Sequence, residues 1–174
     1  TTAPILSVPK NIIVEATGPD GAVVTLPDSS ATDLVDLSPI VFADQDSGLF
    51  AVGTTVVTVS AIDASGNVTE MTFNVTVQDT TAPVIAVPQE LVLEATTTGG
   101  APSSSLNVTT ADLVDDSPTI VLDTAFLQLG ETLVTATATD ASGNQSIVQF
   151  TVTVLDRTAP ELFIEQDVVV DANQ

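Results

Sequence analysis

An internal repeat organises this chain. The motif Thr-Ala-Pro begins at residues 2, 81 and 158, so its prolines lie 79 and then 77 residues apart. Self-similarity at a fixed period of this length is the signature of a tandem array of one structural unit. The predicted organisation is repeat 1 over residues 1–79, repeat 2 over 80–156, and the first strand or strands of a third repeat over 157–174.

Other motifs recur in the same order within both full repeats. The segment Asp-Leu-Val-Asp at 33–36 returns at 112–115, and each copy is followed shortly by Ser-Pro. The segment Asp-Ala-Ser-Gly-Asn at 63–67 returns at 140–144. Because several motifs keep their order, the two repeats are predicted to be copies of one fold.

The repeats are built from strand-forming patterns. Apolar and polar residues alternate with a period of two at 134–139 and 148–154, and the first repeat does the same at 57–61 and 71–77. This period is typical of strands with one buried face. The Asp-Ala-Ser-Gly-Asn segment between them predicts a hairpin connection. About seven short strands in each repeat predict an all-β fold of tandem immunoglobulin-like antiparallel β-sandwiches.

Taken together, these motifs resemble the hyalin repeat, or HYR, domain family. The resemblance rests on residues 79–84, 111–118, 129–132 and 138–144, and it extends over essentially the whole chain. It implies an immunoglobulin-like fold, extracellular or cell-surface exposure, and occurrence in long tandem arrays associated with adhesion.

The charge of the chain is strongly one-sided. Its 23 acidic residues face only Lys10 and Arg157, giving a net charge of −21. With no basic patch, nucleic acid is excluded as a partner. So much charge of one sign opposes compaction unless bound cations or a salty medium screen it. No apolar run approaches the roughly 18 residues of a membrane span.

Acidic residues are predicted to converge where one repeat follows another. In the expected topology, the loops bearing Asp112 and Asp140 lie at the end of repeat 2 that receives the last strand of repeat 1. Oxygen ligands without any His or Cys suit Ca²⁺ and exclude good zinc or copper sites. The candidate metal ligands are Asp79, Asp112, Asp115, Asp116, Asp140 and Glu15, with Asp33, Asp36, Asp63, Asp156 and Glu94 as their counterparts elsewhere.

Two other interpretations of these acids stay open. Asp and Asn are common turn residues, so the same positions are also typical of ordinary loops. An acidic, halophile-like surface would account for the charge without any specific site. Catalysis is not expected, because no nucleophile–base pair can be assembled without His or Cys. An acid pair such as Asp115 and Asp116 could in principle suit glycoside hydrolysis, but it occurs only in repeat 2, because repeat 1 has Asp36 followed by Leu37.

The predicted function is a structural module of an extracellular filament, stalk or adhesin, stiffened by Ca²⁺ between repeats. The alternative is an adhesin-type module that binds a glycan or protein. Its partners would be neighbouring repeats of the same chain, or identical chains in a fibre if the apolar segment 159–174 adds as a strand to another chain. Four Asn-X-Ser/Thr sequons begin at Asn67, Asn74, Asn107 and Asn144.

Overall fold

The computed structural model describes residues 2–163, and in this part of the chain almost all regular structure is β-strand. The chain forms two compact units. One comprises Thr1–Val87, Val108–Val121 and Ala136–Val148, and the other comprises Pro88–Asn107, Leu122–Thr135 and Gln149–Gln174. The all-β class predicted from the sequence is confirmed. No helix in the described range is long and apolar enough to cross a bilayer.

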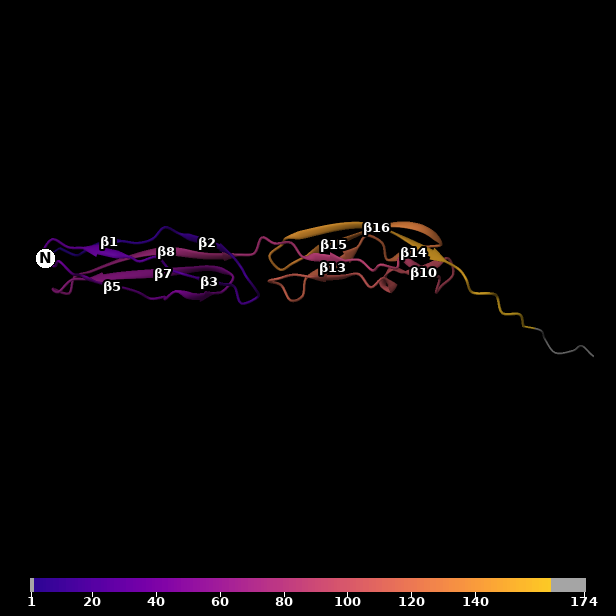
Figure 1. Ribbon diagram of the computed structural model, residues 1–174, viewed down its shortest axis with the longest axis horizontal. Coiled ribbons are helices and arrows are strands. Elements are labelled where there is room, and N and C mark those ends of the chain that lie inside the picture. Colours follow the sequence, from indigo (N-terminus) through magenta and orange to yellow (C-terminus); the bar gives the residue numbers. More distant parts are fainter. Residues whose placement is uncertain (1, 164–174) are drawn as a thin grey trace, which may run out of the picture. The chain divides into compact units, whose positions relative to one another are not determined.

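Repeat 1 contains a four-stranded sheet in the order β2-β8-β7-β5 and two pairs, β1-β4 and β3-β6 (Figure 1). The strands of the large sheet are β2 (Ile12–Glu15), β5 (Ile40–Ala43), β7 (Gly53–Ile62) and β8 (Val68–Gln78). Those of the pairs are β1 (Ile5–Ser7), β3 (Ala22–Val24), β4 (Ser30–Thr32) and β6 (Gly48–Phe50).

The core of repeat 1 follows from the alternation in its two longest strands. Val57, Val59 and Ala61 of β7 are buried, as are Phe73 and the two valines that follow it on the same face of β8. Side chains from β1, β3 and β6 complete this cluster from the other side. The predicted period of two is therefore confirmed, because it places every second side chain in one shared core.

Repeat 2 shows the same strand pairing. Its large sheet has the order β10-β16-β15-β13, and its pairs are β12-β9 and β11-β14. The strands of the sheet are β10 (Val92–Glu94), β13 (Thr119–Leu122), β15 (Gly130–Thr139) and β16 (Gln145–Leu155). The others are β9 (Val84–Ala86), β11 (Gly100–Pro102), β12 (Thr109–Ala111) and β14 (Phe126–Gln128), with a short 3₁₀ turn, η1, at Ser103–Ser105.

Each repeat also contains one parallel pair, which the sequence did not predict. β2 runs parallel to β8, with Val14 opposite Val77, and β10 runs parallel to β16 in the corresponding way. The remaining strand pairs whose register is known are antiparallel. β2 and β10 are edge strands, so each parallel pair lies at one edge of its large sheet.

The hairpin predicted at the repeated Asp-Ala-Ser-Gly-Asn segment is present in both copies. In repeat 1 it joins β7 to β8, and in repeat 2 it joins β15 to β16. Gly66 and Gly143 have φ angles of 84° and 91°, a left-handed conformation that glycine adopts without a steric penalty. In each hairpin the backbone of the leading Asp, Asp63 or Asp140, pairs with that of the closing Asn.

The boundaries predicted near residues 79 and 156 stay a prediction, because the two compact units do not coincide with the sequence repeats. Beyond Leu155 the described chain has no further strand up to Phe163, and Leu162 and Phe163 are each 85% exposed. The rest of the segment proposed to add as a strand, 164–174, lies outside the described residues.

Candidate metal centre

Three carboxylates from distant parts of the sequence meet in one place. Asp79 follows β8, Asp112 follows β12, and Asp140 follows β15. One carboxylate oxygen from each lies within 4.8 Å of the others. All three residues belong to the same compact unit. The structure thus brings together three of the residues that the sequence analysis singled out.

Asp79 is the least satisfied of these acids. Its side chain is only 7% exposed, and its Oδ2 atom is buried without a hydrogen-bond partner in the described part of the protein. Its Oδ1 atom accepts a hydrogen bond from the Thr81 amide at 3.2 Å. A buried carboxylate oxygen without a donor carries a large desolvation cost, so a bound cation would satisfy it.

Asp112 is held by the turn that it begins. Its Oδ1 atom accepts hydrogen bonds from the amides of Val114 and Asp115, at 2.8 and 2.9 Å. These amides, that of Asp115 first, hold the pKa of Asp112 below its usual value. No hydrogen bond of its Oδ2 atom is present among those of the described residues, so this oxygen has capacity for a ligand.

Asp140 is buried, with 6% exposure, and is fixed by the hairpin that follows it. Its Oδ1 atom accepts a hydrogen bond from the Asn144 amide at 2.8 Å, and its Oδ2 atom accepts one from Asn144 Nδ2 at 2.9 Å. Asn144 Nδ2 also donates to the Asp79 carbonyl at 3.0 Å. Two residues on, the Ser146 hydroxyl donates to the Pro83 carbonyl at 2.5 Å. The hairpin therefore holds the segment 79–83 in place.

Asp115 is not part of the cluster, and both of its carboxylate oxygens accept hydrogen bonds from backbone amides. Its Oδ1 atom accepts a hydrogen bond from the Ser117 amide, and its Oδ2 atom accepts one from the Ala141 amide, both at 2.9 Å. Oδ1 thus closes the turn after β12, and Oδ2 joins that turn to the hairpin after β15. Asp116 is exposed. Metal binding by Asp115 and Asp116 stays a prediction without support from this geometry.

Glu15 contacts the segment 79–83 between β8 and β9, called the linker below, and not the carboxylate cluster. Its Oε1 atom accepts a hydrogen bond from the Thr80 amide at 2.6 Å, and the hydroxyls of Thr80 and Thr81 also donate to its carboxylate. The Thr80 amide is the main cause that lowers the pKa of Glu15 below its usual value. Glu15 thus clamps the backbone at Thr80, and its predicted role as a metal ligand stays a prediction.

The counterparts in repeat 1 reproduce the same hydrogen bonds. Asp33 Oδ1 accepts from the amides of Val35 and Asp36, and Asp63 accepts from the amide and Nδ2 of Asn67. The pKa of Asp33 is lowered by these turn amides, that of Asp36 first, and the pKa of Asp63 is lowered chiefly by the Asn67 side chain. Asp36, like Asp115, joins two loops through the amides of Ser38 and Ala64.

Asp156 follows β16 and Glu94 ends β10, so they are the counterparts of Asp79 and Glu15 in repeat 2. Glu94 Oε1 accepts hydrogen bonds from the Arg157 amide at 2.6 Å and from the Thr158 hydroxyl at 3.2 Å. Asp156 is exposed and accepts a hydrogen bond from the Thr158 amide. Within residues 2–163, no third acid joins them. Their predicted role as metal ligands stays a prediction.

Sequence reasoning placed Asn144 in a hairpin and in a sequon with Ser146, but it gave neither side chain a hydrogen-bonding role. Their counterparts in repeat 1 act in the same way, because Asn67 bonds Asp63 and the Thr69 hydroxyl donates to the Pro4 carbonyl. The signal was present in the repeats: an Asn after the hairpin glycine, with Ser or Thr two residues later, occurs in both.

The chemistry of the cluster is that of a hard-cation site. All its donors are carboxylate oxygens, and Ca²⁺ takes 6–8 oxygen ligands in flexible geometry. Near a protein surface, two unit charges about 4 Å apart interact by about 4 kcal/mol, so three gathered carboxylates repel one another appreciably. Few positive charges are available to offset this repulsion, because the chain has only Lys10 and Arg157 against 23 acidic residues.

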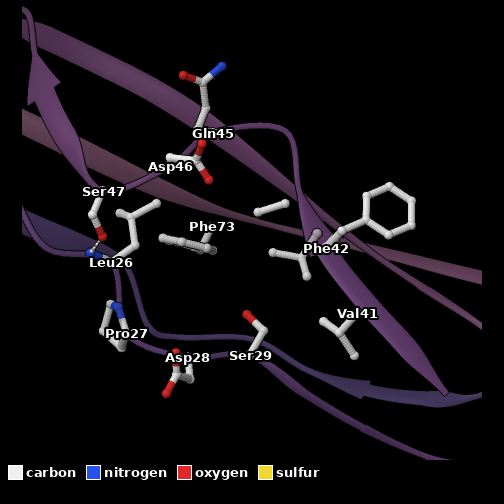
Figure 2. A pocket seen from close by; sticks show the side chains of 12 residues that line it. Leu26, Pro27, Asp28, Ser29, Val41, Phe42, Gln45, Asp46, Ser47 and Phe73 are labelled. Carbon is white, nitrogen blue, oxygen red and sulfur yellow. Dashed lines mark hydrogen bonds between the residues drawn. The ribbon is translucent and has the colours of Figure 1, made fainter. Parts of the chain in front are cut away.

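A separate hollow of about 260 Å³ lies beside β5 (Figure 2). Phe73, Val59, Leu26 and Val41 are among the residues that line it, and Asp28, Asp46, Ser29 and Ser47 add polar groups. Figure 2 shows the exposed ring of Phe42 directed away from Leu26 and Phe73. The hollow thus lacks the presented aromatic face on which a sugar stacks, and it does not favour the alternative of a glycan-binding module.

Comparison with known proteins gives a consistent result. The HYR domain profile matches residues 1–77 and 78–154. Hyalin of Strongylocentrotus purpuratus is 36% identical over 94% of this chain, and hyalin of Lytechinus variegatus is 33% identical over 94%. The chain spans only 15% and 33% of the lengths of these relatives.

Among solved structures, a protocadherin fragment, PcdhgB3 EC1-4, aligns with 90% of this chain and 50% of its own length. The identity is 17% and the TM-score is 0.42. A likeness of this size carries no information on function.

Proposed function

Because the chain belongs to the HYR domain family, we propose that it is a structural module of an extracellular tandem-repeat filament, stalk or adhesin, stiffened by Ca²⁺ where repeat 2 follows repeat 1. The family agrees with the extracellular location predicted from the sequence. The ligands are Asp79, Asp112 and Asp140. The proposal assigns no catalytic role.

The observation that carries this proposal is the buried Oδ2 atom of Asp79. It has no hydrogen-bond donor in the described residues, and it belongs to a residue whose carboxylate lies within 4.8 Å of two others. An ordinary turn aspartate uses its oxygens on nearby amides, as Asp115 does. Asp79 leaves one buried oxygen without a donor, and a bound cation would satisfy it.

Bound Ca²⁺ would act on the linker directly. Asp79 belongs to the linker, whereas Asp112 and Asp140 lie on two loops of repeat 2. A cation held by all three adds a cross-link to a segment that Glu15 and Asn144 already hold by hydrogen bonds. Backbone carbonyls and water would supply the remaining oxygens.

Calorimetric titration with Ca²⁺, together with urea unfolding in Ca²⁺ or EGTA at matched ionic strength, tests the proposal. A ligand that binds only the folded state stabilises it by about 2.7 kcal/mol at a hundredfold excess over Kd. We expect Asp79→Asn to abolish the Ca²⁺-dependent gain. In EGTA the same variant should equal or exceed the wild type in stability, because it removes a buried charge that has no partner.

Asp33→Asn is the matched control. Asp33 begins the same turn as Asp112, with the same two amide hydrogen bonds, but no third carboxylate joins it in the described residues. It should keep the full Ca²⁺-dependent gain. Hydrogen exchange of the Thr80 and Thr81 amides should slow on Ca²⁺ binding if the linker stiffens. If only molar NaCl stabilises the protein and Ca²⁺ does nothing, the acids form a solvated surface and the proposal is wrong.

A further inference from the structure

The four sequons of this chain differ sharply in what their side chains do in the folded protein. We propose that Asn107 is the glycan acceptor of this extracellular chain, and that the other sequons are structural or sheltered positions. The ligand class is an N-linked oligosaccharide. This inference rests on the extracellular location and on the sequons, and it is independent of the cation site.

The sequon at Asn144 is engaged at both of its recognition residues. Asn144 Nδ2 has two hydrogens, and it donates one to the Asp79 carbonyl and one to Asp140 Oδ2. A sugar attached to Nδ2 replaces one of these hydrogens, so one bond would be lost. The Ser146 hydroxyl is also bound, to the Pro83 carbonyl. A glycan at this position is incompatible with the observed hairpin.

The sequon at Asn67 is engaged in the same manner. Its Nδ2 atom donates to Asp63 Oδ2 at 2.6 Å, and the Thr69 hydroxyl donates to the Pro4 carbonyl at 2.6 Å. Asp63 is 8% exposed, so a sugar on Asn67 would have to displace a buried contact. Its recurrence in both repeats marks the Gly-Asn-X-Ser/Thr element as part of the hairpin rather than a modification signal.

The sequon at Asn74 lies in the middle of β8. Asn74 is half-buried, and its backbone amide donates to Asn11 Oδ1 at 2.9 Å. The next residue, Val75, is fully buried, and the hydroxyl of Thr76 shares a hydrogen bond with Thr54 on β7. This sequon is built into a central strand, where a bulky sugar has little room.

Asn107 differs from the other three in its exposure. It is exposed, it lies in the loop between η1 and β12, and no hydrogen bond of its side chain is found among the described residues. The hydroxyl-bearing residue of its sequon, Thr109, is exposed as well. Glycans on Asn-X-Ser/Thr sites are bulky, solubilising surface groups, so an exposed loop suits them.

The surface beside Asn107 offers a seat for the first sugar. A hollow of about 220 Å³ adjoins it, and its lining is Pro88, Glu90, Val92, Leu93, Ser105 and Leu106. Val92 and Leu93 belong to β10, an edge strand of its sheet. Edge strands are templates for unwanted pairing with other chains, and natural proteins cover or blunt them. A glycan at Asn107 would cover this edge.

The transfer itself needs a lipid-linked oligosaccharide pyrophosphate as the donor. The bond from Asn107 Nδ2 to the anomeric carbon of the first sugar forms as the bond from that carbon to the pyrophosphate oxygen breaks. The lipid pyrophosphate leaves, and the amide gives up one proton. Asn107 can lose that hydrogen without losing a contact within the described residues, whereas Asn144 cannot.

Secretion of the chain from insect cells, followed by enzymatic deglycosylation in heavy-oxygen water and peptide mass spectrometry, measures the occupancy of each sequon. We expect most of the folded, secreted protein to carry the label at Asn107, with none at Asn67 or Asn144. Thr109→Ala should abolish the label without touching Asn107 or the fold, since Thr109 is exposed.

An unmodified Asn107 in folded, secreted protein would overturn the proposal, as would glycans on Asn67 or Asn144. A Ca²⁺ titration of the same preparation keeps this result separate from the cation site. An unmodified Asn107 in protein that binds Ca²⁺ would contradict only the glycan proposal. A labelled Asn107 in protein that does not bind Ca²⁺ would contradict only the cation proposal.

Discussion

Thr110, on β12, buries a hydroxyl group that has no partner. Its Oγ1 atom is buried and finds no hydrogen bond in the described part of the protein. Leaving a buried polar group unsatisfied costs about 1–3 kcal/mol. Repeat 1 has Ala31 at the matching position, partly buried and packed against the core. An apolar side chain is therefore compatible with this place in the fold.

We expect Thr110→Val to stabilise the protein by about 1–3 kcal/mol, because valine has nearly the same shape and removes the unsatisfied hydroxyl. Burial of the added methyl group contributes about 0.8 kcal/mol within this range. Urea unfolding followed by circular dichroism measures the change, which should appear as a higher midpoint at unchanged slope.

Thr109→Val is the matched control for this prediction. Thr109 neighbours Thr110 on the same strand, but its side chain is exposed. The same chemical change there should alter stability by no more than about 0.5 kcal/mol. If Thr110→Val leaves the midpoint unchanged or lowers it, the hydroxyl has a partner in solution, such as a buried water, and the reasoning fails.

Three further predictions follow from backbone geometry, the core and titration. Gly21 has a φ of 107°, and a Cβ there would meet the β6 backbone, so Gly21→Ala should lower the free energy of unfolding by more than about 2 kcal/mol. A Cβ at Gly18 would stand in open space, so Gly18→Ala should be nearly neutral; urea unfolding measures both changes. Leu127 is fully buried, so Leu127→Ala should cost about 2–5 kcal/mol, against less than about 1 kcal/mol for the half-exposed Leu129. The pKa of Asp33 is lowered in the folded protein, so this carboxylate stabilises the fold at pH values above its ordinary pKa of 3.8, and the stabilisation is lost as the pH falls through the lower pKa of the folded state. Asp33→Asn should therefore destabilise the protein at pH 7 and approach the wild type in acid. A difference that persists in acid would contradict that assignment.

The strands and hairpins could be predicted because their signals are local. The alternation at 134–139 and 148–154 and the glycine at 143 fix a strand, a turn and a strand without knowledge of the rest. The parallel pairing of β2 with β8 could not be predicted in this way, because the residues that pair lie about 60 positions apart in the sequence. Period-two patterns give the buried face of a strand but not the direction of its neighbour.

The candidate site could be predicted only in part for the same reason. Topology alone brought Asp79, Asp112 and Asp140 to one end of a sandwich, and the structure confirms that they meet. Topology could not tell which acids point together, since Asp115 lies three residues from Asp112 but directs its carboxylate to the amides of Ser117 and Ala141 and is not part of the cluster. Nor could topology show that the Glu15 carboxylate would accept a hydrogen bond from the Thr80 amide of the linker.

The two meanings first given to these acids, turn residue and metal ligand, are compatible at a single position. Asp112 begins a turn with Oδ1, and Asp140 begins a hairpin with both oxygens while each oxygen keeps a free lone pair. The turns hold the carboxylates in place before any cation arrives, so little ordering is left to oppose binding. Among the described residues, a third carboxylate, that of Asp79, joins these turns only in repeat 2. The turn bonds would be formed in either state, and the cation would add a further tie between Asp79 and these turns to the hydrogen bond that Asn144 already makes.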